Sequence, residues 1–147
     1  MHGVRQNERL TAATAVVLLV MLAVEGVTIL FVRPLLSLHE LIGVALIPPV
    51  ALKLGAAGYR FARYYQGRSE YIEKGPPHPL MRFLVAPVLV LSTLGILATG
   101  VAILVLHQRQ GIVVGLHKAS FVFWIGAAGI HVLVYAPRIP LFLRRAR

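Results

Sequence analysis

A few ionisable side chains interrupt an otherwise apolar sequence, and their types and spacing determine what chemistry the chain can do. They are Glu25, His39, Glu40, Lys53, His117, Lys118 and His131. His39 and Lys53 are 14 residues apart, and so are His117 and His131. Fourteen residues make close to four helical turns, so the members of each pair would share one helix face, about 21 Å apart. Imidazole nitrogens are ligands of iron and zinc.

The composition excludes a water-soluble protein. Of the 147 residues, 58% are hydrophobic and only 14% are charged, whereas an average soluble domain has about 25% charged residues. The mean hydropathy is +0.79, and a soluble fold of this size cannot bury so much apolar surface. The sequence has no cysteine, which excludes disulfides, thiolate metal sites and covalently attached c-type haem.

Four apolar stretches are each long enough to cross a bilayer. They cover residues 10–32, 35–57, 83–106 and 112–135. About 20 residues of helix cross about 30 Å of hydrocarbon, where only helices satisfy every backbone polar group in segments of this kind. We therefore predict an all-α integral membrane protein, a four-helix transmembrane bundle that forms one domain over residues 1–147.

The second stretch carries additional local signals. Its helix is expected to continue through an aromatic and arginine-rich segment to about residue 65. Ser37 and Glu40 form the S-x-x-E pattern of a capping box, which predicts a helix start near Ser37 or at Pro34. The Pro48-Pro49 pair predicts a bend near the middle of the membrane.

Lysine and arginine residues gather in three places: the N-terminal arm, the end of the second stretch with the loop 66–82 that follows it, and the tail 136–147. The positive-inside rule therefore places both termini and this loop in the cytoplasm, which makes the chain a multi-pass protein of the inner (cytoplasmic) membrane. Because the net charge of +10 is sorted to one side of a bilayer, we expect no nucleic-acid partner. The basic tail is expected to lie on anionic lipid headgroups.

The predicted topology also sets the depth of the ionisable residues. The second and fourth helices both run from outside to inside, so His39 and His117 would lie at similar depth near the outer surface. Lys53 and His131 would face each other near the inner surface. The bundle could therefore present two stacked sites, each made by two helices.

Two neutral imidazoles across about 10 Å of bundle core suit a six-coordinate, low-spin haem iron. Bundle cores also accommodate flat apolar cofactors of this kind. Zinc would need further ligands, but the chain lacks Cys and Asp, and only Glu25 and Glu40 lie near the outer site. These residues favour haem over zinc, with His39, His117 and His131 as the candidate metal ligands.

Four short motifs carry a family resemblance: His39 in SLHELIG, Lys53 in ALKLG, His117 in GLHKASF and His131 in GIHVLVY. With ligand positions 14 residues apart on two parallel helices, the chain resembles the four-helix transmembrane cytochrome b family, which includes membrane cytochrome subunits of bacterial oxidoreductases. The resemblance implies that His39 and His117 are the axial ligands of an outer haem b, and that His131 is one ligand of an inner haem. Histidines fill all four places in that family, so Lys53 departs from its pattern.

Lys53 leaves the inner site open between two interpretations. A neutral lysine amine could bind iron opposite His131, because burial favours the uncharged form. Alternatively the inner site holds no haem, Lys53 extends to the inner headgroups, and His131 binds a quinone or bonds between helices. The sequence is compatible with one haem or two.

Further polar residues are candidates for contacts around an outer haem. Glu25 could accept a hydrogen bond from His39 and fix its tautomer, take up protons from a quinol, or pair with Lys118. Arg33, Arg109 and Lys118 could balance haem propionates or anchor the chain at the interface.

The sequence thus predicts a b-type cytochrome that carries electrons between the quinone pool and a partner redox protein or subunit. Such a chain is an electron carrier or membrane anchor of an oxidoreductase, with no catalytic residue of its own. The sequence is compatible with a homo-oligomer. One alternative is a cofactor-free membrane scaffold or transporter subunit. A third is a haem sensor or haem-handling protein, which would use Lys53 as a labile ligand.

Overall fold

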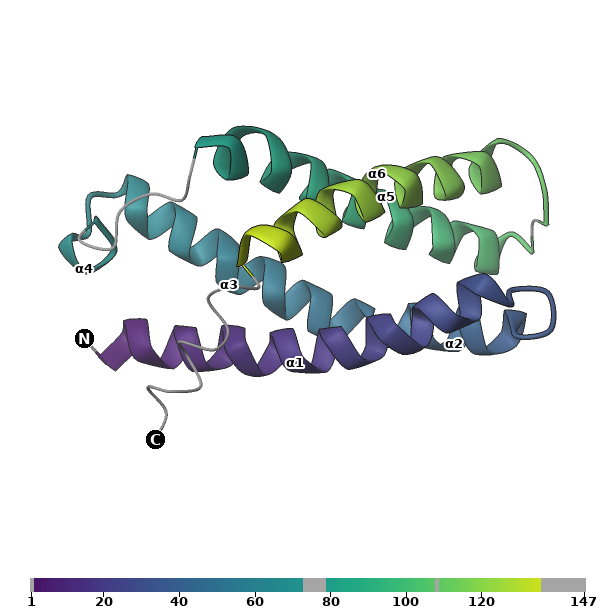
Figure 1. Cartoon of the computed structure of the whole chain (residues 1–147), viewed down its shortest axis with the longest axis horizontal. Helices are drawn as coiled ribbons and strands as arrows, with labels where there is room; N and C mark the ends of the chain where they lie inside the picture. The colour runs from purple at the N-terminus through teal and green to yellow at the C-terminus, as the bar shows by residue number, and fades with distance from the viewer. Residues whose placement is uncertain (1, 73–78, 108, 136–147) are drawn as a thin grey trace. The chain divides into compact units, whose positions relative to one another are not determined.

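The computed structural model describes residues 2–72, 79–107 and 109–135, and the side chains of residues 10–134 within those ranges (Figure 1). Every regular element in them is helical. In chain order these are α1 (His2–Leu30), α2 (Leu36–Ala45), α3 (Ile47–Tyr65), α4 (Ser69–Ile72), the π-helix η1 (Met81–Val85), α5 (Ala86–Val105) and α6 (Ile112–Tyr135). The predicted basic tail 136–147 and residues 73–78 of the predicted loop lie outside the described residues.

Four segments are long and apolar enough to cross a membrane: Leu10–Leu30, Leu36–Tyr65, Met81–Val105 and Ile112–Val134. The first, third and fourth end within two residues of the predicted stretches, and the second continues to Tyr65, as expected for its helix. The predictions of an all-α chain and of four membrane-length helices are confirmed. The orientation of these helices in a bilayer and the location of the termini stay predictions.

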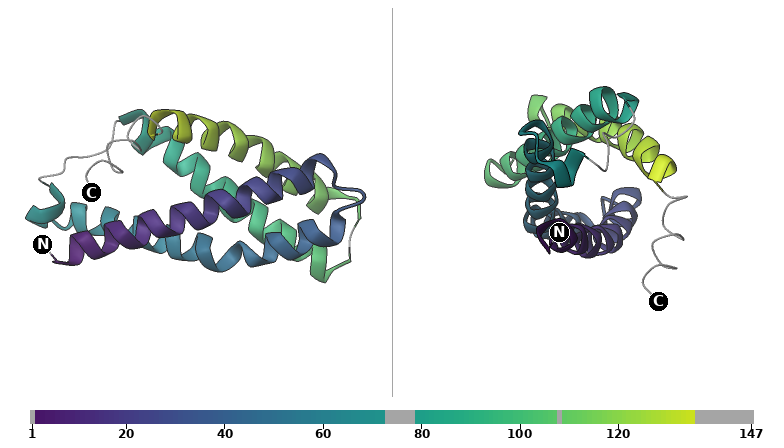
Figure 2. Two further views of the ribbon diagram at one scale, coloured as in Figure 1. Left: turned by 60° about the horizontal axis from the view of Figure 1, so that its bottom comes forward. Right: turned by 90° about the vertical axis from the view of Figure 1, so that its left-hand side faces the viewer.

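The chain divides into two compact units, Met1–Gly75 and Pro76–Arg147. In the first unit the chain reverses after α1, and α1 packs along both α2 and α3 (Figure 1). In the second unit it reverses after α5, and α5 with η1 packs against α6 (Figure 2). Each unit is therefore a helical hairpin in which the end of one helix lies beside the start of the next.

The second membrane-length segment is interrupted at Leu46, between α2 and α3. Pro48 and Pro49 are the second and third residues of α3, and a proline has no N–H to donate to the carbonyl four residues earlier. Leu46 N still donates to Ile42 O at 2.8 Å. The interruption is therefore confined to one turn, at the place that the proline pair indicated.

The predicted capping box is wrong. Helix α2 begins at Leu36, and its N-cap residue Leu35 makes no side-chain capping bond. Main-chain hydrogen bonds continue through the connection between α1 and α2. Leu35 N donates to Phe31 O at 3.1 Å, and His39 N donates to Leu35 O at 2.9 Å. Ser37 therefore lies inside the first turn, where a serine does not act as the N-cap.

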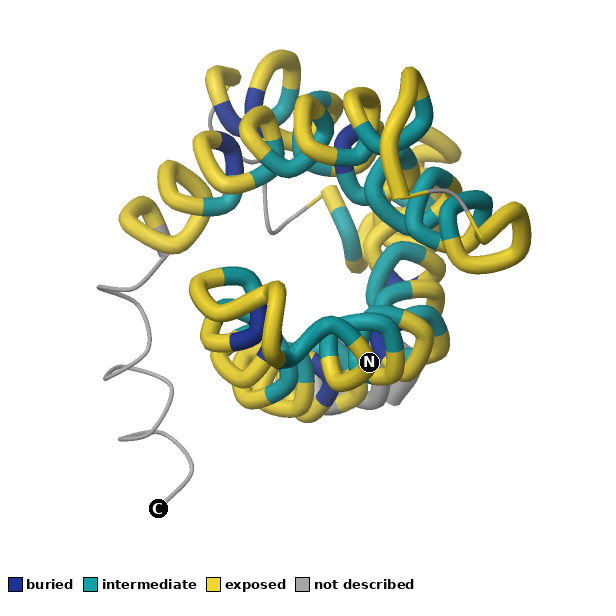
Figure 3. Tube along the Cα trace, turned by 90° about the vertical axis from the view of Figure 1, so that its right-hand side faces the viewer, coloured by how far each residue is buried: buried dark blue, intermediate teal, exposed yellow. Residues whose placement is uncertain are grey.

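Few residues of the described chain are buried (Figure 3); they include polar as well as apolar ones, whereas many large apolar side chains are exposed. The buried polar residues of the described chain are Thr14, Glu25, Thr28 and Ser92. Thr28 is only 1% exposed, whereas Leu19 is 66% exposed and Leu91 is 69% exposed. Lipid would cover such apolar surfaces, so this distribution agrees with the membrane prediction. It also directs attention to the few buried polar groups.

Candidate functional site

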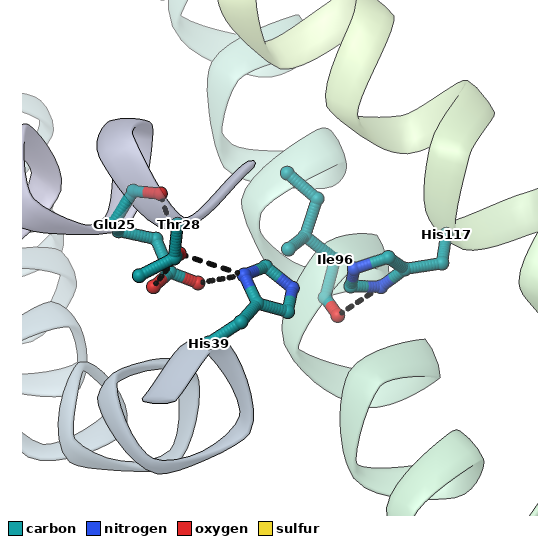
Figure 4. A network of polar contacts seen from close by, with 5 residues as sticks. All are labelled: Glu25, Thr28, His39, Ile96 and His117. Atoms are coloured by element: carbon teal, nitrogen blue, oxygen red, sulfur yellow. Dashed lines mark hydrogen bonds and ion pairs between the residues drawn. The ribbon is translucent and has the colours of Figure 1, made fainter. Parts of the chain in front are cut away.

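In the first unit, His39 meets two polar residues of α1. It is the fourth residue of α2, and the short connection after α1 brings it beside Glu25 and Thr28. Its Nδ1 lies 2.8 Å from Glu25 Oε1 and 3.1 Å from Thr28 Oγ1 (Figure 4). The structure shows the predicted contact of Glu25 with His39, and the other two roles predicted for Glu25 stay predictions.

The threonine hydroxyl identifies the donor in this contact. Thr28 Oγ1 lies 2.7 Å from the main-chain oxygen of Glu25 and 3.0 Å from its Oε2, and both of these atoms are acceptors. A hydroxyl has one hydrogen, so Thr28 gives it to Glu25 and presents a lone pair to the imidazole. His39 Nδ1 therefore donates, and in the neutral ring Nε2 carries the lone pair.

In the second unit, His117 reaches the same protonation pattern with different partners. Its Nδ1 lies 3.1 Å from the main-chain oxygen of Ile96 (Figure 4) and 3.0 Å from Thr99 Oγ1. Thr99 gives its hydrogen to Gly95 O at 2.5 Å. A carbonyl oxygen can only accept, so His117 Nδ1 carries the proton, and Nε2 again carries the lone pair.

Two glycines allow α6 to approach α5 closely. A Cβ on Gly95 would lie 2.7 Å from Ser120 Oγ, and one on Gly100 would lie 3.3 Å from His117 Cε1. Small residues at such contacts let membrane helices pack with their backbones close together. The imidazole of His117 therefore sits against the main chain of α5 and has little room to move.

Lys53 has a partner within its own unit. Its half-buried Nζ donates to the main-chain oxygen of Thr11 on α1 at 2.9 Å, which ties α3 to α1. His131 occupies an exposed position on α6. The predicted pairings of Lys53 with His131 and of His39 with His117 each join residues of different units, so both stay predictions.

The cationic candidates for haem propionates are all exposed. Arg33 lies in the turn between α1 and α2, Arg109 in the connection between α5 and α6, and Lys118 on α6 directly after His117. Within the described parts of the chain, no group of three or more His, Asp or Glu side chains is placed to hold a metal ion.

Sequence reasoning missed three members of the site. Thr28 follows Glu25 by three residues, which is the spacing of neighbours on one helix face, so this signal was present in the sequence. Thr99 carried a weaker signal, because hydroxyls are common in apolar helices, where they bond their own backbone. Ile96 acts through its main-chain oxygen, for which the side chain gives no signal.

Comparisons of the chain with protein-family models, with curated proteins and with solved structures give no match. The functional argument therefore depends on this chain's own residues.

Proposed function

We propose that this protein is a b-type membrane cytochrome that carries electrons between the quinone pool and a partner redox protein or subunit. The observation that supports it most is the state of the two histidines. Each has its Nδ1 proton held by an acceptor of its own unit. Histidines that bind metals characteristically donate the other ring N–H to a carboxylate or a backbone carbonyl.

The positions of the two histidines in their helices support a shared ligand. His39 is the fourth residue of α2 and His117 is the sixth residue of α6. In the predicted topology both helices start at the outer surface, so the two side chains would lie at similar depth. We propose that these two side chains would together hold one haem b.

A haem held in this way supplies one-electron exchange at its iron. The chain's own residues would do the rest. His39 and His117 would present Nε2 lone pairs, while Glu25 and the Ile96 carbonyl keep both rings in the tautomer that makes this possible. If His39 and His117 both bind the iron, the protein's own side chains would exclude oxygen from it.

The remaining site assignments belong to the same proposal. Arg33, Arg109 and Lys118 would balance the propionates at the outer surface. A second haem would use His131 and Lys53, and without it His131 would be available to a quinone. We place the protein in the inner cell membrane, where it would meet a redox partner subunit or a second copy of itself.

A cofactor-free scaffold or transporter subunit is the second candidate function. The observation that favours it is that these polar side chains directly join neighbouring helices: His39 joins α2 to α1, and Lys53 joins α3 to α1. A haem sensor or haem-handling protein differs from a cytochrome in needing a ligand that dissociates readily, for which Lys53 is the candidate.

Purification in detergent after expression with ample haem supply tests the proposal. The wild-type protein should be red, with one haem per chain by pyridine haemochrome assay, or two if the inner site is filled. His39→Ala and His117→Ala should each lose the outer haem. His107→Ala is the matched control, because His107 is exposed in a connection, and it should keep the full haem content.

A colourless, folded wild-type protein would overturn the proposal in favour of the scaffold. If His39→Ala and His117→Ala keep the wild-type spectrum and haem content, the ligand assignment is wrong. The variants His131→Ala and Lys53→Met then show whether a second haem is present, since only an inner haem would respond to them.

A further inference from the structure

The two histidines have the same tautomer but acceptors of different charge. His39 Nδ1 donates to the carboxylate of Glu25 at 2.8 Å. His117 Nδ1 donates to the neutral main-chain oxygen of Ile96 at 3.1 Å. Hydrogen bonds to an ionised acceptor are shorter and about twice as strong as those between neutral groups. The pair is therefore chemically unequal, although both rings would be neutral imidazoles.

The carboxylate acts from a protected position. Glu25 is 8% exposed and Thr28 is 1% exposed. Electrostatic effects are larger in such surroundings than in water, because little solvent is present to screen them. Where a metal-binding imidazole donates a hydrogen bond to a carboxylate, the bond raises the basicity of the ligand.

Thr28 holds this carboxylate in place. Its hydroxyl lies 3.0 Å from Glu25 Oε2 and 2.7 Å from the Glu25 main-chain oxygen, one turn earlier on the same helix. Thr99 makes the corresponding contact with His117 in the second unit, at 3.0 Å, but no carboxylate accompanies it there. The hydroxyl is thus common to both units, and the negative charge is the feature that differs.

We infer that Glu25, held by Thr28, makes His39 the stronger electron donor of the two ligands and so favours the oxidised iron. This inference rests on the proposed haem ligation. Reduction adds one electron to the site, and a fixed negative charge opposes that addition. Glu25 and Thr28 are positioning residues, since they act through His39.

Glu25→Gln is the decisive variant. The amide is nearly isosteric, and its oxygen is a neutral acceptor of the kind that His117 already has. We expect haem to remain bound and the reduction equilibrium to shift about tenfold toward ferrous iron, which corresponds to about 59 mV for one electron. Thr28→Val should shift it in the same direction by less, because the carboxylate remains but is held by one bond fewer.

Thr99→Val is the matched control in the second unit. It removes the equivalent hydroxyl from His117 but no charge, so any change in its potential should be much smaller than that of Glu25→Gln. The potentials are measured by dithionite titration with mediators, followed by absorbance. If Glu25→Gln binds haem with an unchanged or lower potential, the inference is wrong, although the cytochrome proposal stands.

A measurement on haem-free protein separates the two proposals further. ¹⁵N NMR of the histidine side chains should show His39 as the Nδ1–H tautomer in the wild type. The proton should be less strongly localised on Nδ1 in Glu25→Leu and unchanged in Thr99→Val. A His39 Nδ1 ¹⁵N resonance that is the same in the wild type and in Glu25→Leu would overturn the role of Glu25, whether or not the protein binds haem.

Discussion

The two histidine-bearing hairpins, α1 with α2 and α5 with α6, share one arrangement. In each, a threonine near the end of the first helix contacts the Nδ1 of a histidine near the start of the second. The first hairpin takes its main acceptor from a side chain, and the second takes it from the main chain. A main-chain acceptor survives almost any substitution at Ile96, whereas a side-chain acceptor can be changed by one substitution at Glu25. The first hairpin is therefore the one whose chemistry can be tuned.

The hairpins also differ in the space around the site. A Cβ on Gly100 would lie 3.3 Å from the ring of His117, whereas one on Gly43 would lie 3.7 Å from Glu25 Oε1. The first contact is tight, and the second is an ordinary van der Waals distance. Both hairpins hold their histidine by polar contacts, and the second adds close packing against the imidazole ring.

Of the substitutions that test this comparison, Glu25→Leu should lower the stability of the protein most. It removes the acceptor of His39 Nδ1 and leaves Thr28 Oγ1, at 3.1 Å, as the remaining partner. We expect the free energy of unfolding to fall by about 1–3 kcal/mol, as for a buried polar group whose partner is removed. Thermal unfolding of haem-free protein in detergent, followed by circular dichroism, measures it. The control is Val27→Leu at the exposed neighbouring position, which should not change the stability. Equal stability of the two variants would show that the contact between Glu25 and His39 does not stabilise this hairpin.

Gly95→Ala should destabilise the second hairpin by about 1–3 kcal/mol, because the new methyl group would meet Ser120 Oγ at 2.7 Å. Ser120→Ala should restore part of the loss, which a double-mutant cycle detects as coupling. Gly115 has nothing within 4 Å of an added Cβ, so Gly115→Ala serves as the control. A Gly95→Ala protein that unfolds like this control would show that α5 and α6 are not closely packed at Gly95.

Lys53→Met should lower the free energy of unfolding by less, about 1 kcal/mol. It removes one hydrogen bond between helices, and such bonds contribute modestly in membrane proteins. If Lys53 only joins α3 to α1, haem content stays the same while the unfolding temperature falls slightly. If Lys53 also binds an inner haem iron, the haem content falls from two per chain to one. The haemochrome assay decides between these roles.

The smallest effect should come from the matched pair Gly100→Ala and Gly43→Ala. The first should displace the His117 ring by a few tenths of an ångström and broaden or shift the absorbance bands of bound haem. The second should leave the spectrum unchanged, since its methyl group has room. Identical spectra for both variants would show that packing does not constrain His117 more than Glu25.

The fold was largely predictable because long apolar runs and proline positions are local signals. The spans and the interruption at Leu46 follow from them. The capping box failed because main-chain bonds through the connection set the start of α2, and Ser37 had no part in it. Within the site, Glu25 could be named because a carboxylate in an apolar span is rare. The main-chain oxygens of Ile96 and Thr11 could not be predicted from the sequence, because the rotation of each helix decides which main-chain oxygens contact a neighbouring side chain.

In this chain, conservative substitutions should be tolerated better at many large apolar residues than at the buried polar ones. Exchanges among aliphatic residues at outward positions such as Leu19 and Leu91, which are 66% and 69% exposed, should be nearly silent. Thr28→Val, which keeps the volume and shape of the side chain, should be among the more harmful changes in the first hairpin. In a saturation library of this chain, substitutions by residues of similar size should therefore be tolerated less often at the buried hydroxyls than at the exposed large aliphatic residues.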